Sequence, residues 1–367
     1  MSHEWSRRSF LERVGSALGA LGGVAAWGAE PTPTNQQITS MGLVIYCRRI
    51  KAARLKTARP PFDLYQPSHF LDECIRSGAG GMQVDLSALS EAAAEAIRER
   101  ARQSDRFVEA IISLPKDDSD LDRFEHAVRI SRRAGAEVAR TTIIPGRRYE
   151  RFKSLEDFRT FERAGEQSVR RAIPVLERHR VKLAIENHKD QRNDERLRLF
   201  ERIDHEYVGA CVDTGNSVAL LEDALETVKA FAPWAHSVHL KDQAVQRVPT
   251  GFLLADIPLG QGCLDLPAMV QVLQAARPGI HFSLELITRD PLHVPCLTDA
   301  YFRLFDDLPA RDVARAVSFV ERHGAASLPR VSGLSDDEQL ARESRNVRES
   351  IRYAAENLAL RPPPRSP

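Results

Sequence analysis

The stretch that decides the fold is residues 181–187, which read Val-Lys-Leu-Ala-Ile-Glu-Asn. It is a short β-rich run that ends in a carboxylate, as expected of a buried strand followed by a polar loop. Three later runs repeat this design, at residues 207–213 (YVGACVD), 234–239 (WAHSVH) and 281–285 (HFSLE). Each run is followed by a loop and a helical pattern. Four consecutive strands are therefore predicted to carry polar groups at their C-terminal ends: Glu186, Asp213, His239 and Glu285.

Side-chain alternation along these four runs separates two faces. Alternate residues of a strand share a face, and the residues that share the face of the four polar groups are all small: Ala184, Gly209, Cys211, Ala235, Ser237 and Ser283. The opposite face is large and apolar, as expected beneath a shell of helices: Val181, Leu183, Ile185, Val208, Val212, Val238, Phe282 and Leu284. Lys182 and His281 break the rule of small residues, but both fall near the N-terminal ends of their strands, where charge reaches solvent.

The rest of the chain continues this alternation of strands and helices. Earlier strands are predicted at residues 41–47, 81–86, 107–114 and 138–144. The first and fourth of these are predicted to be followed by loops rich in Arg and Lys. Helices are predicted at residues 67–77, 90–103, 121–133, 194–201, 217–231, 266–276 and 310–322, with a long one after Ser154. Eight strands alternating with helices over about 280 residues are typical of a closed parallel barrel. We therefore expect a single α/β domain, a (β/α)8 TIM barrel, over residues 41–324.

The N-terminal segment is predicted to be a targeting signal and not part of the fold. Ser6-Arg7-Arg8-Ser9-Phe10-Leu11 matches a twin-arginine export signal. The uncharged stretch after it is shorter than a membrane span of about 20 residues. We expect a signal peptide at residues 1–29, a polar linker at residues 30–40, and a periplasmic or exported protein with no stable membrane span after cleavage. An ordinary amphipathic N-terminal helix is the alternative.

The C-terminal segment is predicted to extend the barrel. Residues 325–360 are expected to form a helical extension, because a capping box of Ser335 and Glu338 opens an Arg-rich helical pattern. This extra helix is expected to pack on the outside of the barrel or on a partner chain, so a homo-oligomer is left open. Residues 361–367 are rich in proline and are expected to be disordered.

Composition excludes several classes of protein. The net charge of +1 is unlike that of the strongly basic chains that bind nucleic acid. A hydrophobic content of 43% supports a sizeable core. The cysteines are scattered without a CxxC pair, which indicates buried thiols and neither a disulfide framework nor a zinc knuckle. These features favour an α/β enzyme that acts on a small molecule.

The four strand-end residues form a donor set for one divalent metal ion. Three carboxylates and one imidazole suit Mn²⁺, Mg²⁺ or Co²⁺, with Zn²⁺ also compatible, and leave positions open for substrate. Without a cation, three carboxylates placed together would raise at least one pKa sharply, because their charges repel. The alternative is that these acids are unrelated surface residues at strand ends.

A resemblance to a known family is carried by motifs in the second half of the chain. They are Ile185-Glu186-Asn187-His188, Val212-Asp213-Thr214-Gly215-Asn216, Val238-His239-Leu240-Lys241-Asp242, Gly260-Gln261-Gly262-Cys263-Leu264-Asp265 and Leu284-Glu285. In order and type they resemble the xylose isomerase-like TIM-barrel family of the sugar phosphate isomerase/epimerase type. The likeness weakens toward the N-terminus, where Gly80-Gly81-Met82-Gln83-Val84-Asp85 is similar to the family's second strand but carries Asp85 where a glutamate is usual.

The resemblance implies a metal-dependent sugar isomerase or epimerase. The metal would be held by Glu186, Asp213, His239 and Glu285, with Glu186 and Glu285 doubling as the acid/base pair. A metal that chelates a carbonyl and the neighbouring hydroxyl acidifies the C–H between them and stabilises an enediolate. Two glutamates on opposite sides can then remove and return the proton.

Three neighbouring residues are predicted to bind the substrate, a sugar or sugar acid. His188 could contact a substrate hydroxyl or remain solvated. Lys241 could polarise a substrate oxygen or pair with Asp242 at the surface. Arg147 lies in the basic loop after the fourth strand, which could favour an anionic substrate or simply carry solvated charges.

Three rival functions are weighed against this one. The AP-endonuclease branch of the superfamily uses three zinc ions, but Asn216 stands where that branch carries a histidine ligand, which argues against DNA repair. A lyase or decarboxylase acting on an oxidised sugar would use the same metal site. A non-catalytic exported sugar-binding barrel would not need both Glu186 and Glu285.

Overall fold

The computed structural model describes residues 38–144 and 146–362, which lie in the compact unit that begins at Thr34. The expected signal peptide and the linker up to residue 37 fall outside the described residues, as do residues 363–367 of the expected tail. Within the described ranges, no helix combines the length and apolar character that crossing a membrane requires.

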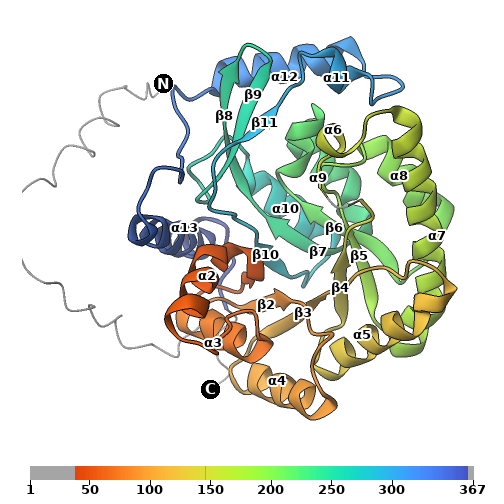
Figure 1. Cartoon of the computed structure of the whole chain (residues 1–367), viewed down its shortest axis with the longest axis vertical. Helices are drawn as coiled ribbons and strands as arrows, with labels where there is room; N and C mark the ends of the chain where they lie inside the picture. Colours follow the sequence, from red (N-terminus) through yellow and green to blue (C-terminus); the bar gives the residue numbers. More distant parts are fainter. Residues whose placement is uncertain (1–37, 145, 363–367) are drawn as a thin grey trace, which may run out of the picture. The chain divides into compact units, whose positions relative to one another are not determined.

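Eight parallel strands of the described chain close into a barrel, in the order β1-β10-β7-β6-β5-β4-β3-β2 (Figure 1). Their bounds are β1 Gly42–Val44, β2 Gly81–Val84, β3 Phe107–Ile111, β4 Val138–Thr141, β5 Lys182–Glu186, β6 Val208–Asp213, β7 Ala235–Leu240 and β10 Phe282–Leu284. Every neighbouring pair in this order is parallel in the ladders that join the strands. The predicted (β/α)8 barrel is confirmed.

Helices cover the outside of the barrel and bury its large apolar face. They are α3 Pro67–Ser77, α4 Glu91–Gln103, α5 Leu121–Arg133, α7 Leu155–His179, α8 Asn193–Ile203, α9 Ala224–Phe231 and α10 Leu266–Ala276. Local signals fix their ends: the Ser90 hydroxyl accepts a hydrogen bond from the backbone N–H of Ala93, and Gly78 ends α3 at φ 75°. The outward residues of β5, β6, β7 and β10 are buried beneath these helices, as the alternation predicted.

The first strand is shorter than predicted, and the expected basic loop after it is wrong. β1 ends at Val44, and the chain continues into the 3-10 helix η1 Ile45–Arg48 and the helix α2 Arg49–Ala58. Residues 49–58 are mostly good helix formers, but no side chain at the N-cap makes a capping hydrogen bond that would mark the start of the helix. Its first turn is capped from far along the chain, because the Glu343 carboxylate accepts hydrogen bonds from the backbone N–H groups of Ile50 (2.7 Å) and Lys51 (2.9 Å).

The predicted helix over residues 217–231 is also wrong as one continuous element. The chain forms a 3-10 turn, η3 Asn216–Leu220, and only then the helix α9. Leu221 interrupts the two at φ 62°, and the Asp223 side chain caps the new helix through the N–H of Glu226. The turn keeps Asn216 next to the end of β6.

An antiparallel sheet with no counterpart in the predicted pattern follows the seventh barrel strand. It consists of β8 Asp242–Val248, β9 Gly251–Ile257 and β11 Leu292–Val294, in the order β11-β9-β8. The short helix α11 Asp299–Phe302 and the helix α12 Ala310–His323 lie beside this sheet (Figure 1). Residues 242–257 alternate in character around a Pro249-Thr250 turn, and this hairpin signal was missed because the barrel pattern was followed instead.

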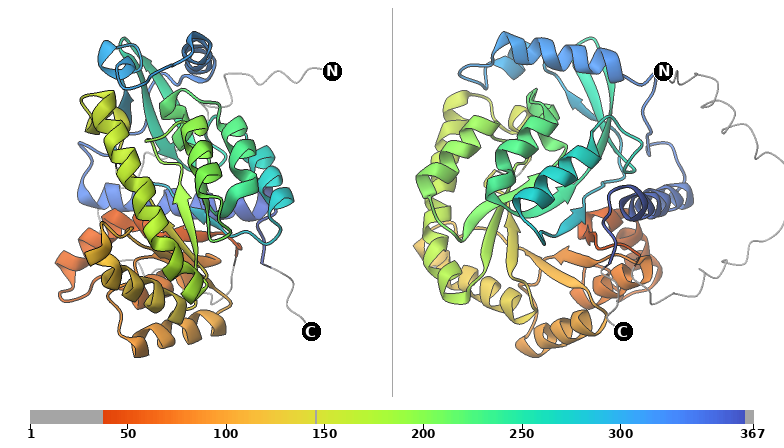
Figure 2. Two further views of the ribbon diagram at one scale, coloured as in Figure 1. Left: turned by 90° about the vertical axis from the view of Figure 1, so that its right-hand side faces the viewer. Right: turned by 180° about the vertical axis from the view of Figure 1, so that it is seen from behind.

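The C-terminal helix α13 Asp336–Asn357 packs beside α2 and η1 (Figure 2). The capping box of Ser335 and Glu338 is present at its start. Besides Glu343, it contributes the Ser350 hydroxyl, which accepts a hydrogen bond from the N–H of Leu259. The helix therefore covers its own barrel within one chain. All five cysteines are free thiols, and only Cys263 is not fully buried.

Candidate metal centre

Four side chains from four strands meet at the C-terminal end of the barrel. Glu186 ends β5, Asp213 ends β6, His239 lies near the end of β7, and Glu285 directly follows β10. All four are buried, and each offers a ligand atom within 4.8 Å of the others. His239 Nδ1 lies 3.7 Å from Glu186 Oε2 and 3.5 Å from Glu285 Oε2. Donor atoms about 2.1 Å from a shared ion stand ~3–4 Å apart, so these spacings suit a common divalent ion.

One buried nitrogen of this cluster makes no hydrogen bond within the described chain. His239 Nδ1 makes no hydrogen bond to any described residue, although the side chain is fully buried. A buried nitrogen without a partner is costly unless something else satisfies it. Its Nε2 atom lies 2.7 Å from Gln83 Oε1, which can only accept. Nε2 therefore carries a hydrogen, and Nδ1 faces the carboxylates. Burial would lower the pKa of His239, but the neighbouring anionic groups raise it well above its ordinary value, so a metal ion would take the place of a proton on Nδ1.

Gln83 is itself held by a polar network inside the barrel. Its Nε2 donates to Glu109 Oε2 at 2.9 Å, and the Ser237 hydroxyl donates to the same oxygen at 2.7 Å. The Gln83 amide is thereby oriented with its oxygen toward His239. Hydrogen-bonded partners of this kind fix the orientation of a metal-binding histidine and raise its basicity.

The Gln83→Leu variant is expected to bind metal 10- to 100-fold more weakly, a loss typical of removing the partner of a metal-binding histidine. Leucine keeps the bulk but cannot accept the hydrogen of His239 Nε2. Calorimetric titration of Mn²⁺ into chelator-treated protein measures the change. Gln271→Leu, at an exposed position on α10, is the matched control. An affinity equal to that of the unsubstituted protein would refute the role given to Gln83.

Glu186 is clamped in its charged form. Arg140 of β4 donates from Nε (2.7 Å) and Nη2 to Oε2, and Asn216 Nδ2 donates to Oε1 at 2.9 Å. Burial alone would raise the pKa of Glu186, but the Arg140 guanidinium holds it well below its usual value. Glu186 is therefore a carboxylate with both oxygens fixed in direction.

Asp213 is positioned mainly by backbone groups. The N–H groups of Gly215 (2.9 Å) and Asn216 (2.8 Å) donate to Oδ1, which turns Oδ2 toward the other ligands. Asn187, next to Glu186, bonds both the N–H (2.7 Å) and the carbonyl (2.9 Å) of Asp213 and ties the ends of β5 and β6 together. Burial raises the pKa of Asp213, which a neighbouring cation would counter.

Lys241 supplies such a cation. Its ammonium lies 3.0 Å from Asp213 Oδ2 and 2.9 Å from Glu285 Oε2. Burial would raise the pKa of Glu285, but the charge of Lys241 holds it well below its usual value. The alternative pairing of Lys241 with Asp242 at the surface is therefore wrong, because Lys241 is buried and bonds two of the four cluster residues.

Asp242 organises a neighbouring loop instead. Its Oδ2 atom accepts hydrogen bonds from the N–H groups of Gly260 and Gly262, both at 2.9 Å. A Cβ atom on Gly262 would lie 2.0 Å from Asp242 Oδ1. Glycine is thus required there by close approach to a buried carboxylate.

Further charged groups surround the cluster. Lys189 is buried, and burial together with the charge of Lys241 lowers its pKa to about 8. The hairpin brings in Asp256, which lies 3.2 Å from Arg289. In the described part of the chain, the four carboxylates of this centre are matched by four cations. His239, which a bound metal ion would keep neutral, is not counted among them. The carboxylates are Glu186, Asp213, Asp256 and Glu285, and the cations are Arg140, Lys189, Lys241 and Arg289.

The residues predicted from the loops have different surroundings. His188 is half-buried, and its Nδ1 lies 2.9 Å from the carbonyl oxygen of Gly146. Arg147 forms an ion pair with Glu150 on the short helix α6 Arg148–Arg151. For both, contact with a substrate stays a prediction. Arg148 belongs to the same basic segment but is completely buried. It therefore neither faces an anionic substrate nor lies in solvent, the two alternatives predicted for this loop.

Sequence reasoning missed several groups of this centre. Arg140 lies on the interior face of a buried strand, and a charge at such a position was a usable signal. Gln83 and Asn216 lay within the motifs already quoted, but their spacing alone assigned them no contact. No sequence pattern pointed to Lys189 or Asp256, because the conformations of a loop and of the hairpin bring them to this centre.

Comparison with known proteins adds sequence and fold likenesses. Residues 71–315 match the profile of the xylose isomerase-like TIM barrel. The 3-oxo-isoapionate decarboxylase of Pectobacterium atrosepticum is 28% identical over 219 residues, which cover 59% of this chain and 75% of that protein. Among solved structures, D-psicose 3-epimerase in the presence of D-fructose has a TM-score of 0.53 at 12% identity, covering 81% of this chain and 94% of that one. L-ribulose 3-epimerase has a TM-score of 0.54 at 11% identity, covering 87% and 94%. The structural likenesses show the fold.

Proposed function

This chain belongs to the xylose isomerase-like TIM barrel family, and from that premise we propose that it is a metal-dependent isomerase or epimerase of a sugar or sugar derivative. The observation that carries the proposal is the convergence of Glu186, Asp213, His239 and Glu285 around His239 Nδ1, a buried nitrogen that makes no hydrogen bond within the described chain. The epimerases of the same fold agree with it.

These four residues would hold one divalent ion, for which the oxygen-rich donor set favours Mn²⁺, Mg²⁺ or Co²⁺ and accommodates Zn²⁺. When bound, the ion polarises a substrate carbonyl and the neighbouring hydroxyl, and it stabilises the enediolate that proton removal leaves. The barrel fixes the donors before the ion arrives, since Arg140, Asn216 and Gln83 already orient them.

The proton would move between the substrate and two carboxylates. Glu186 and Glu285 are both held deprotonated, by Arg140 and Lys241 respectively, so either can accept a proton from carbon. Return by the other glutamate inverts the carbon, and return to the adjacent carbon exchanges aldose and ketose. Lys241 would leave its two carboxylates when a divalent ion takes them, and its ammonium would then donate a hydrogen bond to a substrate oxygen.

The charge of the centre favours a second candidate, a lyase or decarboxylase acting on an oxidised sugar acid. Because four carboxylates and four cations already balance in the described centre, a divalent ion leaves two positive charges in excess. A substrate carboxylate would offset that excess. In a β-keto acid, the C–C bond to the carboxylate breaks, CO2 leaves, the electron pair moves to the carbonyl oxygen, and the carbon then takes a proton. The relative named a decarboxylase supports this reading.

Metal removal and solvent exchange test both candidates together. In D2O, the metal-loaded protein is expected to place deuterium at a carbon next to a carbonyl in at least one member of a panel of sugars, oxidised sugars and sugar acids. Treatment with a chelator is expected to abolish this exchange, and added Mn²⁺ to restore it. Release of CO2 from a 3-oxo acid would favour the second candidate. Exchange that survives metal removal, or hydrolysis without exchange, would contradict the proposal.

A further inference from the structure

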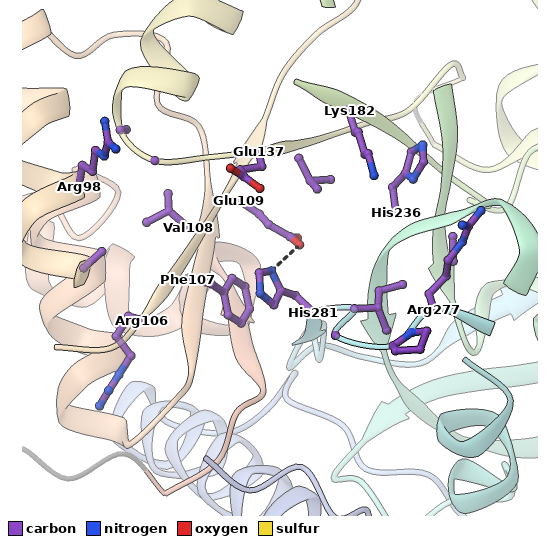
Figure 3. Close-up of a pocket in the computed structure, with 18 of the residues that line it drawn as sticks. Arg98, Arg106, Phe107, Val108, Glu109, Glu137, Lys182, His236, Arg277 and His281 are labelled. Atoms are coloured by element: carbon purple, nitrogen blue, oxygen red, sulfur yellow. Dashed lines mark ion pairs between the residues drawn. The ribbon is translucent and has the colours of Figure 1, made fainter. Parts of the chain in front are cut away.

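A large cavity opens at the other end of the barrel, where the strands begin (Figure 3). Its volume is about 750 Å³, which is within the usual range for small-molecule sites. It is bounded by the starts of β3, β5 and β7, by the end of α4 and by the loop between α10 and β10. We call this cavity the N-terminal mouth. The metal centre lies at the opposite ends of the same strands.

The N-terminal mouth is rich in positive charge. Its lining includes five basic side chains and only two carboxylates, Glu109 and Glu137. The basic side chains are Arg98, Arg102, Arg106, Lys182 and Arg277. Glu137 is already paired with Arg132, whereas Lys182 forms no ion pair with any residue that the structure describes. Lys182 is an exposed lysine on the interior face of β5, and together with His281 it departs from the small residues that the late strands carry on that face. The field in this mouth attracts an anion.

The buried His236 Nε2 atom in the mouth makes no hydrogen bond to any described residue, and Glu109 Oε1 has no hydrogen bond there beyond its ion pair with His281. The structure makes room for the His236 ring, since a Cβ atom on Gly209 would lie 2.7 Å from Nε2. Burial and the charges of Lys182 and Arg277 lower the pKa of His236 to about 4, so the ring is neutral and can donate to an anion. Glu109 Oε1 lies 3.5 Å from His281 Nδ1, whose ring stacks on Phe107.

We propose that the N-terminal mouth is a second binding site, for a small oxyanion that also carries hydroxyl groups. The oxyanion would lie between Lys182 and Arg277 against His236, where Figure 3 shows these side chains on one side of the cavity. A ligand hydroxyl would donate to Glu109 Oε1, which makes no hydrogen bond to any described residue and lies 3.5 Å from His281 Nδ1. This site does not depend on the function proposed for the metal centre.

Titration of the histidine ring resonances by NMR tests the proposal on the full chain. D-Glycerate and glycerol 3-phosphate are the probes, because they pair hydroxyl groups with a carboxylate or a phosphate, and glycerol is the neutral control. At least one probe is expected to shift the His236 and His281 resonances saturably, and bound anion is expected to raise the pKa of His236. Glycerol is expected to shift neither resonance.

Charge reversal shows where the probe binds. Lys182→Glu is expected to weaken binding at least tenfold, while Arg345→Glu, at an exposed position on α13, is expected to leave it unchanged. Binding of glycerate alone would assign a carboxylate ligand, and binding of glycerol 3-phosphate alone a phosphate ligand. If neither probe gave a saturable shift, or if Lys182→Glu bound as tightly as the unsubstituted chain, the proposal would be overturned.

Discussion

Replacing Glu285 by Gln is expected to lower turnover by about 10²- to 10⁴-fold, the range for loss of a positioned acid or base. Glutamine keeps the size of the side chain and an oxygen for the metal, but it cannot take up a proton. It also removes one of the two carboxylates that Lys241 contacts. Turnover is measured with whichever substrate shows deuterium exchange, after the metal content of the variant has been matched to that of the original protein.

The same variant separates an enzyme from a sugar-binding barrel. A binding protein carrying Glu285→Gln would keep its ligand affinity and would show no turnover to lose. Glu201→Gln, at an exposed position on α8, is the control and is expected to keep full activity. Unchanged turnover in the Glu285→Gln variant would remove Glu285 from the acid/base pair.

Replacing Arg148 by Met is expected to lower the free energy of unfolding by about 3–5 kcal/mol, the usual cost of breaking a buried ion pair from one side. Arg148 has no exposed surface, and its Nη1 lies 2.8 Å from Glu195 Oε2. Its guanidinium also lies 3.5 Å above the Phe158 ring and donates to the carbonyl oxygen of Leu304. Methionine fills much of the space but leaves the Glu195 charge buried with only the more distant Arg159, at 3.7 Å, as a cationic partner.

Urea unfolding followed by circular dichroism measures this loss. Arg345→Met, on the exposed side of α13, is the control and is expected to change stability by less than about 0.5 kcal/mol. Adding Glu195→Gln to Arg148→Met is expected to recover part of the loss, because a neutral amide can still accept the N–H of Arg192 that caps α8. A single-variant loss below about 1 kcal/mol would mean that the pair behaves like a surface salt bridge.

The sequence was sufficient to predict that these four polar side chains lie together, because parallel strands of a barrel all end at the same rim. Every barrel strand finishes at the same rim, so a strand that ends in Glu186 or Asp213 places that group beside the end of its neighbour. Alternation of side chains then selects the interior face. Both inferences need only the local period of two and the order of the strands.

The groups that tune these ligands depend on contacts across the barrel. Gln83 and Arg140 reach His239 and Glu186 from other strands, and only the closed register of the barrel puts them within hydrogen-bonding distance. Helix α2 escaped prediction for a similar reason, since the Glu343 carboxylate that caps its first turn comes from the C-terminal helix. Helix propensity depends on residues close in sequence, so it cannot predict contacts with such distant partners.

The ammonium of Lys241 between Asp213 and Glu285 bears on the order in which the protein matures. With that ammonium in place, repulsion between the carboxylates is relieved before any ion is available, so assembly of the barrel need not wait for cofactor supply. The polypeptide can fold first and bind the proposed ion afterwards. If the proposed ion is withdrawn, the barrel is expected to remain folded and to lose only its activity.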